Sequence, residues 1–151
     1  MASTGAMSID PESLPKAEFA FPGLLRDQLV AAILDGSKTS TTSLVEEYEH
    51  HGEPLPTVGT RSVVVDSKDR AVAIIEVTSV RVVPLAQVDL AHALNEGEGF
   101  RAVSEWRTGH ERFWHSHEIR RELDDPALIV DDATLVVLER FRVLTDLSAP
   151  G

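Results

Sequence analysis

A segment rich in hydroxyl groups around a single lysine carries the densest chemical signal in the sequence. Six of the seven positions from 37 to 43 bear a hydroxyl, and the seventh is Lys38. The chain contains only three lysines, and the other two lie in the N-terminal stretch and in a turn. A lysine among hydroxyls can act as a base for one of them if partial burial lowers its pKa toward neutrality. A polar helix end that runs into an edge strand explains the same composition without chemistry.

Two glutamates and two ring side chains form a second group of candidates. Glu96 and Glu98 flank Gly97, and their carboxyl groups either act as acid or base or are solvated in a turn. Trp106 and His110 are four residues apart and therefore share one face of a helix. An indole N–H and a titratable ring suit stacking on a nucleobase and hydrogen bonding to it, although core packing would use the same face.

The composition disfavours several kinds of site. The absence of cysteine removes disulfides, thiolate zinc sites and a cysteine nucleophile. His110, His115 and His117 share no regular ligand spacing, so we expect no metal. The sequence contains no glycine-rich strand-to-helix turn and no GxxxxGK(S/T) motif, so the usual nucleotide phosphate cradles are absent and we expect no cofactor.

Apolar spacing and turn residues predict three helices and three strands. The helices cover residues 24–34, 86–94 and 101–123, and the strands cover residues 63–66, 71–83 and 134–144. Asp66 precedes a hairpin turn at 67–70, where it caps the turn or reaches the mouth of a pocket. The order of helix, extended segment, hairpin, two helices and closing strand predicts an α+β fold, a small mixed β-barrel with helices covering its openings.

Length and charge limit the partners. A chain of 151 residues fits one domain. Twenty-five acidic residues against 14 Lys+Arg give a net charge of −11, which argues against a protein that grips long nucleic acid by its phosphates. No apolar run approaches the roughly 20 residues that cross a bilayer, and the N-terminus lacks a signal-peptide pattern. We expect a cytoplasmic protein with no membrane partner, and the sequence carries no signal for an oligomeric state.

Several short motifs occur in an order shared with a known family. They are Ile33-Leu34-Asp35-Gly36, Lys38-Thr39-Ser40-Thr41-Thr42-Ser43, Glu96-Gly97-Glu98-Gly99, Glu105-Trp106-Arg107 with His110 and Phe113, and Glu139-Arg140-Phe141-Arg142-Val143. Together they resemble the ASCH domain, a branch of the PUA-like superfold, and its longer bacterial branch related to the N4-acetylcytidine amidohydrolases. The resemblance implies an ASCH domain over residues 19–144, between a flexible leader at 1–18 and a flexible tail at 145–151.

The resemblance also implies an amidohydrolase of a small acylated nucleoside such as N4-acetylcytidine. Carried over by position, the catalytic set is Lys38, Thr41 and Glu96, and Glu98 is an alternative to Glu96. The candidates for substrate binding are Ser37, Ser43, Asp66, Glu98, Trp106 and His110. Ser43 stands where the family often has an arginine, which weakens recognition of phosphate or carboxylate at that point.

Amide hydrolysis needs a nucleophile, a base and an acid for the leaving nitrogen. Thr41 Oγ would attack the acyl carbonyl, a neutral Lys38 would accept its proton, and Glu96 would return a proton to the leaving amine or activate water. In a straight strand, positions 38 and 41 face opposite sides and lie about 10 Å apart. The mechanism therefore requires a turn or a bulge between them.

Two other functions remain open. The chain could be a non-catalytic module that binds RNA or a nucleotide, or a ribonuclease that depends on Lys38. Tight RNA binding needs several phosphate contacts, whereas a neutral nucleoside needs none. The net charge of −11 therefore favours a small nucleoside or nucleotide over RNA as the partner.

Overall fold

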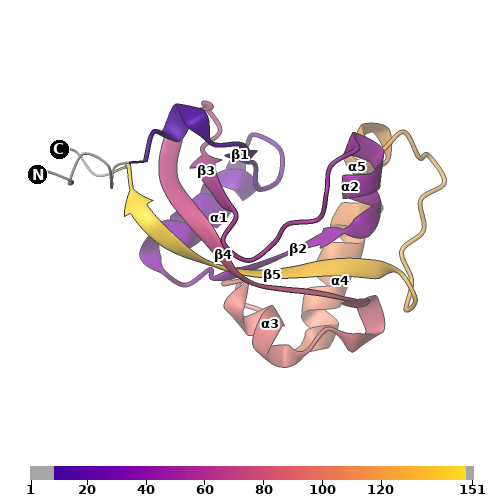
Figure 1. Cartoon of the computed structure of the whole chain (residues 1–151). Coiled ribbons are helices and arrows are strands. Elements are labelled where there is room, and N and C mark those ends of the chain that lie inside the picture. The colour runs from indigo at the N-terminus through magenta and orange to yellow at the C-terminus, as the bar shows by residue number, and fades with distance from the viewer. Residues whose placement is uncertain (1–8, 149–151) are drawn as a thin grey trace, which may run out of the picture.

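One mixed β-sheet organises the chain. A computed structural model describes residues 9–148, and five strands form a sheet in the order β1-β3-β4-β5-β2 (Figure 1). The strands are β1 (Lys16–Ala17), β2 (Ser40–Leu44), β3 (Arg61–Val65), β4 (Ala71–Pro84) and β5 (Leu135–Asp146). β1 pairs with β3 in parallel, and every other pair is antiparallel. The long strands β4 and β5 join the two halves of the molecule.

Five α-helices flank this sheet. They are α1 (Leu24–Asp35), α2 (Val45–His51), α3 (Leu90–Asn95), α4 (Val103–Trp114) and α5 (His117–Glu122), with 3-10 turns at Pro11–Ser13 and Leu85–Gln87. Helix α1 lies at the end of the sheet that holds β1 and β3, and α2, α4 and α5 gather at the opposite end (Figure 1). The expected combination of helices with a mixed sheet, an α+β fold, is confirmed.

The sheet is not closed into a barrel by strand pairing. Among the described residues, β1 and β2 are the two edges and do not pair with each other. β1 is only two residues long, and β2 runs directly into α2, so neither edge extends far enough to close the sheet. The architecture is consistent with the expected PUA-like fold, with the five-stranded sheet left open between its two edge strands.

Two of the expected helices are interrupted by capping residues. The segment 101–123 divides at His115–Ser116, because the Ser116 hydroxyl accepts from the Ile119 N–H and begins α5. The segment 86–94 divides because the Asp89 carboxylate accepts from the His92 N–H and begins α3. Helix α2 was not expected, because its sequence after β2 is mostly charged and has no apolar period.

Two apolar clusters fill the two halves. One packs α3, α4 and α5 against the sheet, and its largest buried side chains are Trp106 and Trp114. The other packs α1 and Phe19 against β3, β4 and Phe141. The buried Val and Ile side chains of β3 and β4 account for the apolar pattern that predicts these strands.

Parts of the expected leader and tail are joined to the sheet. Lys16 and Ala17 pair with Val63 and Val64, and Asp146 pairs with Ala73. Residues 1–8 and 149–151, which belong to the leader and tail expected to be flexible, lie outside the described residues. Within residues 9–148, none of the helices has the length and apolar character needed to cross a membrane.

Candidate functional site

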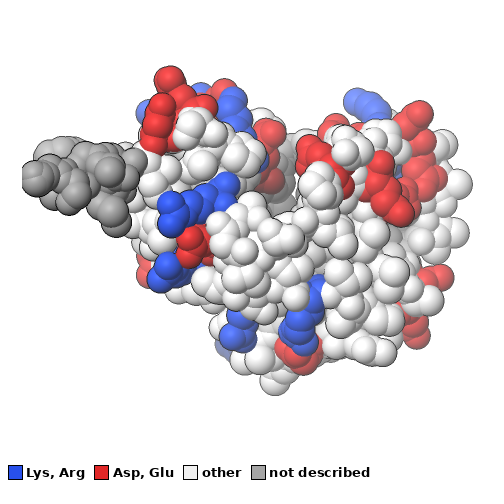
Figure 2. Space-filling model, viewed as in Figure 1, with Lys and Arg blue, Asp and Glu red and all other residues white. Residues whose placement is uncertain are grey.

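A cavity of about 820 Å³ opens between the sheet, the loop before α1, and helices α2 and α4. The surface is hollowed between the part that holds β1 and β3 and the part that holds α2 and α5, and acidic side chains lie on both sides of the hollow (Figure 2). Seven aromatic side chains contribute to the lining: Phe19, Phe21, Tyr48, Phe100, Phe113, Trp114 and Phe141. The cavity therefore offers flat apolar walls together with charged groups.

Glu96, at the end of α3, is the centre of a buried polar network beside this cavity. Only 1% of its surface is exposed. Its Oε2 accepts from Thr42 Oγ1 and from Trp106 Nε1, each at 2.7 Å. Its Oε1 lies 3.2 Å from His110 Nε2 and 3.5 Å from Lys38 Nζ. Burial alone raises the pKa of Glu96, but hydrogen bonds from His110 and His92 and the charge of Lys38 hold it well below its ordinary value.

Lys38 is buried at the same place, with 2% of its surface exposed. Its Nζ lies 2.8 Å from Ser40 O, 3.4 Å from Glu96 O and 3.5 Å from Glu96 Oε1. These three oxygen acceptors match the three donors of a lysine ammonium. Lys38 also lies two residues before β2 begins, so the straight-strand distance between positions 38 and 41 does not apply.

His110 completes the network from helix α4. Its Nδ1 lies 2.9 Å from the Trp106 carbonyl oxygen, and its Nε2 faces Glu96. Both partners are acceptors, so both ring nitrogens donate, as they do in an imidazolium. Burial lowers the pKa of His110, but the hydrogen bond and the charge of Glu96 outweigh it, and the pKa is raised above its ordinary value.

The backbone turn after α3 places Glu96 against the lysine segment. The Thr39 N–H donates to Asn95 O at 2.7 Å. Gly97 has a φ of +72°, and a Cβ at this position would lie 2.6 Å from Ser37 O and 2.8 Å from Lys38 N. Only glycine allows the backbone to approach so closely. Gly97 therefore fixes the separation between Lys38 and Glu96.

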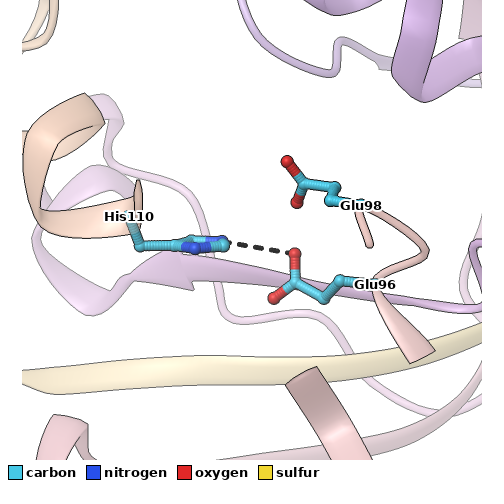
Figure 3. Close-up of side chains that lie close together, drawn as sticks. All are labelled: Glu96, Glu98 and His110. Carbon is cyan, nitrogen blue, oxygen red and sulfur yellow. Dashed lines mark hydrogen bonds and ion pairs between the residues drawn. The ribbon is translucent and has the colours of Figure 1, made fainter. Parts of the chain in front are cut away.

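Glu98 follows two residues later and has a different environment. Its side chain is exposed and lines the cavity, and its carboxyl group lies above the Glu96 carboxyl group and the His110 ring (Figure 3). Burial among cavity groups raises the pKa of Glu98, the charge of Lys38 opposes this, and the charge of Glu96 adds to it. The two glutamates are therefore distinct: one is buried and ionised, and the other is open to a ligand.

Thr41 and Ser43 line the same cavity from the sheet. Thr41 is opposite Glu139 in the register of β2 and β5, so their side chains share one face, whereas Thr42 is opposite the buried Leu138 and faces α3. Within the described structure, no hydrogen bond joins the Thr41 hydroxyl to Lys38 or Glu96. The Thr42 hydroxyl, not the Thr41 hydroxyl, donates to Glu96.

Two residues of this wall were not identified from the sequence as site candidates. The Tyr48 hydroxyl donates to Glu139 Oε2 at 3.3 Å, and both side chains line the cavity. Burial raises the pKa of Glu139 against the opposing hydrogen bond from Tyr48, and burial and the Glu139 charge raise the pKa of Tyr48. The alternating pattern of the last strand predicts that Glu139 lies in a strand. Its position opposite Thr41 depends on the register between β2 and β5, which the sequence does not reveal.

Three of the predicted binding residues lie away from the cavity. Asp66 accepts from the Lys68 and Arg70 N–H groups and caps the hairpin turn. Ser37 N–H donates to Asp35 at the end of α1. Trp106 is fully buried, and its ring stacks on His110 at 4.3 Å rather than facing a ligand. We correct these three assignments from ligand binding to turn capping, helix capping and support of Glu96.

Glu96, Glu98 and His110 place their ligand atoms within 4.8 Å of one another, a spacing that a cation could use. Both Glu96 oxygens already accept hydrogen bonds, and His110 Nε2 donates to one of them. The Lys38 charge also faces the same carboxylate. A metal ion would have to displace these donors and approach two positive groups, so we do not identify this cluster as a metal site.

The lining carries an excess of acidic groups. Seven glutamates and three lysine or arginine residues border the cavity. Each of those cations already pairs with a carboxylate: Lys16 with Asp69, Arg26 with Glu18, and Lys38 with Glu96. A phosphate group in this cavity would therefore meet no lysine or arginine that is free of a carboxylate partner.

The fold and the site define an α+β, PUA-like domain with a polar network at one end of a cavity. The ASCH domain model matches residues 18–145, and the chain belongs to the ASCH domain family. A crystal structure of an ASCH domain from Lactobacillus crispatus JV V101 is similar, with 30% identity, a TM-score of 0.73, and coverage of 85% of this chain and 78% of that chain. Protein EF3133 from Enterococcus faecalis V583 is also similar, with 26% identity, a TM-score of 0.75, and coverage of 89% and 78%. No curated protein matches the chain.

Gly97→Ala tests the close approach of the α3 turn to the lysine segment. We expect it to lower the free energy of unfolding by about 3 kcal/mol, because the new Cβ overlaps backbone atoms and also disfavours the positive φ. Gly99→Ala is the matched control, because Gly99 has a φ of +85° but a Cβ added there would meet nothing within 4 Å. We expect the control to lower the free energy of unfolding by only about 1 kcal/mol, and urea unfolding of both variants measures the difference. Equal losses for both variants would contradict the packing argument.

Thr42→Val tests the hydroxyl that bridges His92 and Glu96. Valine keeps the shape but leaves a buried acceptor without its donor, so we expect the free energy of unfolding to fall by about 1–3 kcal/mol. Thr42→Ser keeps the hydroxyl and should lose less than half as much. Urea unfolding of both variants distinguishes the hydrogen bond from simple packing, because a larger loss in the serine variant would indicate that the methyl group matters more.

The pKa of His110 gives a prediction for the dependence of stability on pH. Its folded pKa is raised above the ordinary value of 6.5, so its stabilising contribution is fully present below that value and is lost as pH rises through the folded pKa. We expect NMR titration of the His110 ring to report a pKa above 6.5. His110→Gln should destabilise the protein more at a pH of about 5.5 than at about 8.5. A His110 pKa below the ordinary value would contradict the description of His110 as a protonated ring that donates to Glu96.

Proposed function

We propose that this ASCH domain hydrolyses an acyl amide on a small nucleoside-like ligand, of which N4-acetylcytidine is the test compound. The observation that carries the proposal is that one cavity is lined both by the Lys38–Glu96 pair and by Thr41. Its volume of about 820 Å³ falls in the range of about 300–1,000 Å³ that is usual for small-molecule sites.

The lining supports a ligand with a flat ring and polar edges. Aromatic walls such as Phe100 and Phe113 offer surfaces for stacking a nucleobase, and the Thr41 and Ser43 hydroxyls offer hydrogen bonds. The paired state of each lysine and arginine in the lining argues against long RNA, whose binding depends on several phosphate contacts. These features favour a neutral ligand over the alternatives of an RNA-binding module or a ribonuclease.

The proposed reaction proceeds through an acyl-threonine. Thr41 Oγ1 forms a bond to the acyl carbon and Lys38 accepts the hydroxyl proton. The C–N bond then breaks, and a glutamate carboxyl group of the site protonates the departing nitrogen to release the amine. Water then cleaves the acyl-threonine, and the proton returns to the Thr41 oxygen. Because Lys38 Nζ faces three acceptors at rest, the base role requires that it lose one proton as the ligand fills the cavity. Once it has accepted the Thr41 proton, Lys38 is again an ammonium and stabilises negative charge on the acyl oxygen.

Release of cytidine from N4-acetylcytidine tests the proposal. We expect turnover by the wild-type protein, and we expect Lys38→Ala and Thr41→Ala each to lower it by at least about 100-fold, since each removes a reacting group. Thr39→Ala is the matched control, because Thr39 is an exposed threonine of the same segment that does not line the cavity. Chromatography of the products gives the rates.

Full activity in either the lysine or the threonine variant would contradict the mechanism. Absence of cytidine release by the folded wild-type protein would contradict the function itself. Titration with a fluorescent RNA at low and at physiological salt tests the rival: binding that weakens steeply as salt rises, together with no turnover, would favour an RNA-binding module.

A further inference from the structure

We propose that Glu98 is the catalytic acid that gives a proton to the leaving amine, and that Glu96 stays ionised as the positioning residue for Lys38 and His110. This assignment rests on the proposed function and adds a division of labour between two carboxyl groups that lie two positions apart in the chain. The supporting observations are the different burial, partners and access to the cavity of these two side chains.

Glu96 is unsuited to carrying a proton to and from a ligand. Its two oxygens face five donor side chains, which are those of Thr42, Trp106, His92, His110 and Lys38. A proton on either oxygen would oppose one of these donors, and it would leave the buried charge of Lys38 without its partner. With 1% of its surface exposed, Glu96 also has almost no surface that a ligand could contact.

Glu98 has the access that Glu96 lacks. Its side chain is exposed and lines the cavity, and Figure 3 shows its carboxyl group above the hydrogen-bonded Glu96–His110 pair and outside that bond. The titratable groups that face it are Glu96 from the end of α3, Lys38 from the segment before β2, and His110 from α4. Burial raises the pKa of Glu98, the charges of Lys38 and His110 oppose this, and the charge of Glu96 adds to it, so that the pKa is raised and the protonated form is favoured.

The turn between the two glutamates holds this arrangement. Gly97 has a φ of +72° and packs on the Ser37–Lys38 backbone, and Gly99 has a φ of +85°. The left-handed Gly97 lies between the two glutamates, whose carboxyl groups lie within 4.8 Å of each other and of the His110 ring nitrogen. One tight turn thus presents an ionised carboxylate to the protein and a second carboxyl group to the ligand.

The proton transfers balance over the two halves of the reaction. In the first, the C–N bond breaks, its electron pair goes to nitrogen, and nitrogen takes the proton of the Glu98 carboxyl group. In the second, water attacks the acyl-threonine and gives a proton to the Glu98 carboxylate, which restores the acid. The net reaction is amide plus water to carboxylic acid plus amine, with no other reactant.

Glu98→Gln is the decisive variant, because glutamine has nearly the same shape and cannot donate an acidic proton. We expect turnover of N4-acetylcytidine to fall by about 100-fold or more, with unchanged ligand affinity by calorimetry and unchanged melting temperature. The wild-type rate should decline as pH rises through the pKa of Glu98, since the acid form is lost, and this decline should be absent in the variant. Glu118→Gln, an exposed change on α5 away from the cavity, is the control for loss of one negative charge.

Each outcome supports or overturns the assignment. Inactivity of the wild-type protein overturns the proposed function and the role of Glu98 together. An active wild type with Glu98→Gln turnover within about threefold of it overturns the role of Glu98 alone. A slow variant that also loses ligand affinity or stability, or that keeps the decline at high pH, overturns the acid role and assigns Glu98 to binding or folding.

Discussion

The buried negative charge of Glu96 is the constraint on which the rest of this structure depends. An ionised carboxylate removed from water costs several kcal/mol unless charges and hydrogen bonds compensate for it. Here the compensation comes from four separate segments, through Lys38 before β2, Thr42 in β2, His92 in α3, and the rings of α4. Because no single segment satisfies the charge, the site forms only when the edge strand, the short helix and the long helix have docked together.

The same constraint separates the groups that support the fold from those that face a ligand. The donors around Glu96 hold one carboxylate in place and leave the Glu98 carboxyl and the Thr41 hydroxyl open to the cavity. Buried polar groups that are fully hydrogen-bonded position their neighbours, whereas exposed ones can exchange protons with a ligand. The excess of glutamates in the lining then selects against phosphate-rich partners, as the net charge of −11 indicates for the whole surface.

Sequence patterns predicted the parts of the site that local rules govern. The hydroxyl-rich segment, the glycine-flanked glutamates and the four-residue spacing on α4 identified Lys38, Glu96 and His110, which the structure brings together. Sequence reasoning missed what depends on long-range register and local capping. The pairing of β2 with β5 turns Thr41 toward the cavity and Thr42 toward Glu96, and Ser116 divides a segment whose apolar spacing predicts one helix.

The most direct test of the central claim is the protonation state of Glu96 in the folded protein. Carbon-13 NMR of the side-chain carboxyl groups, assigned with Glu96→Gln, follows each glutamate as pH falls. We expect the Glu96 resonance to keep its ionised position through the ordinary glutamate value of 4.5, while the exposed glutamates titrate. A Glu96 resonance that titrates with them, or at higher pH, would contradict the claim that an ionised, buried carboxylate organises this site.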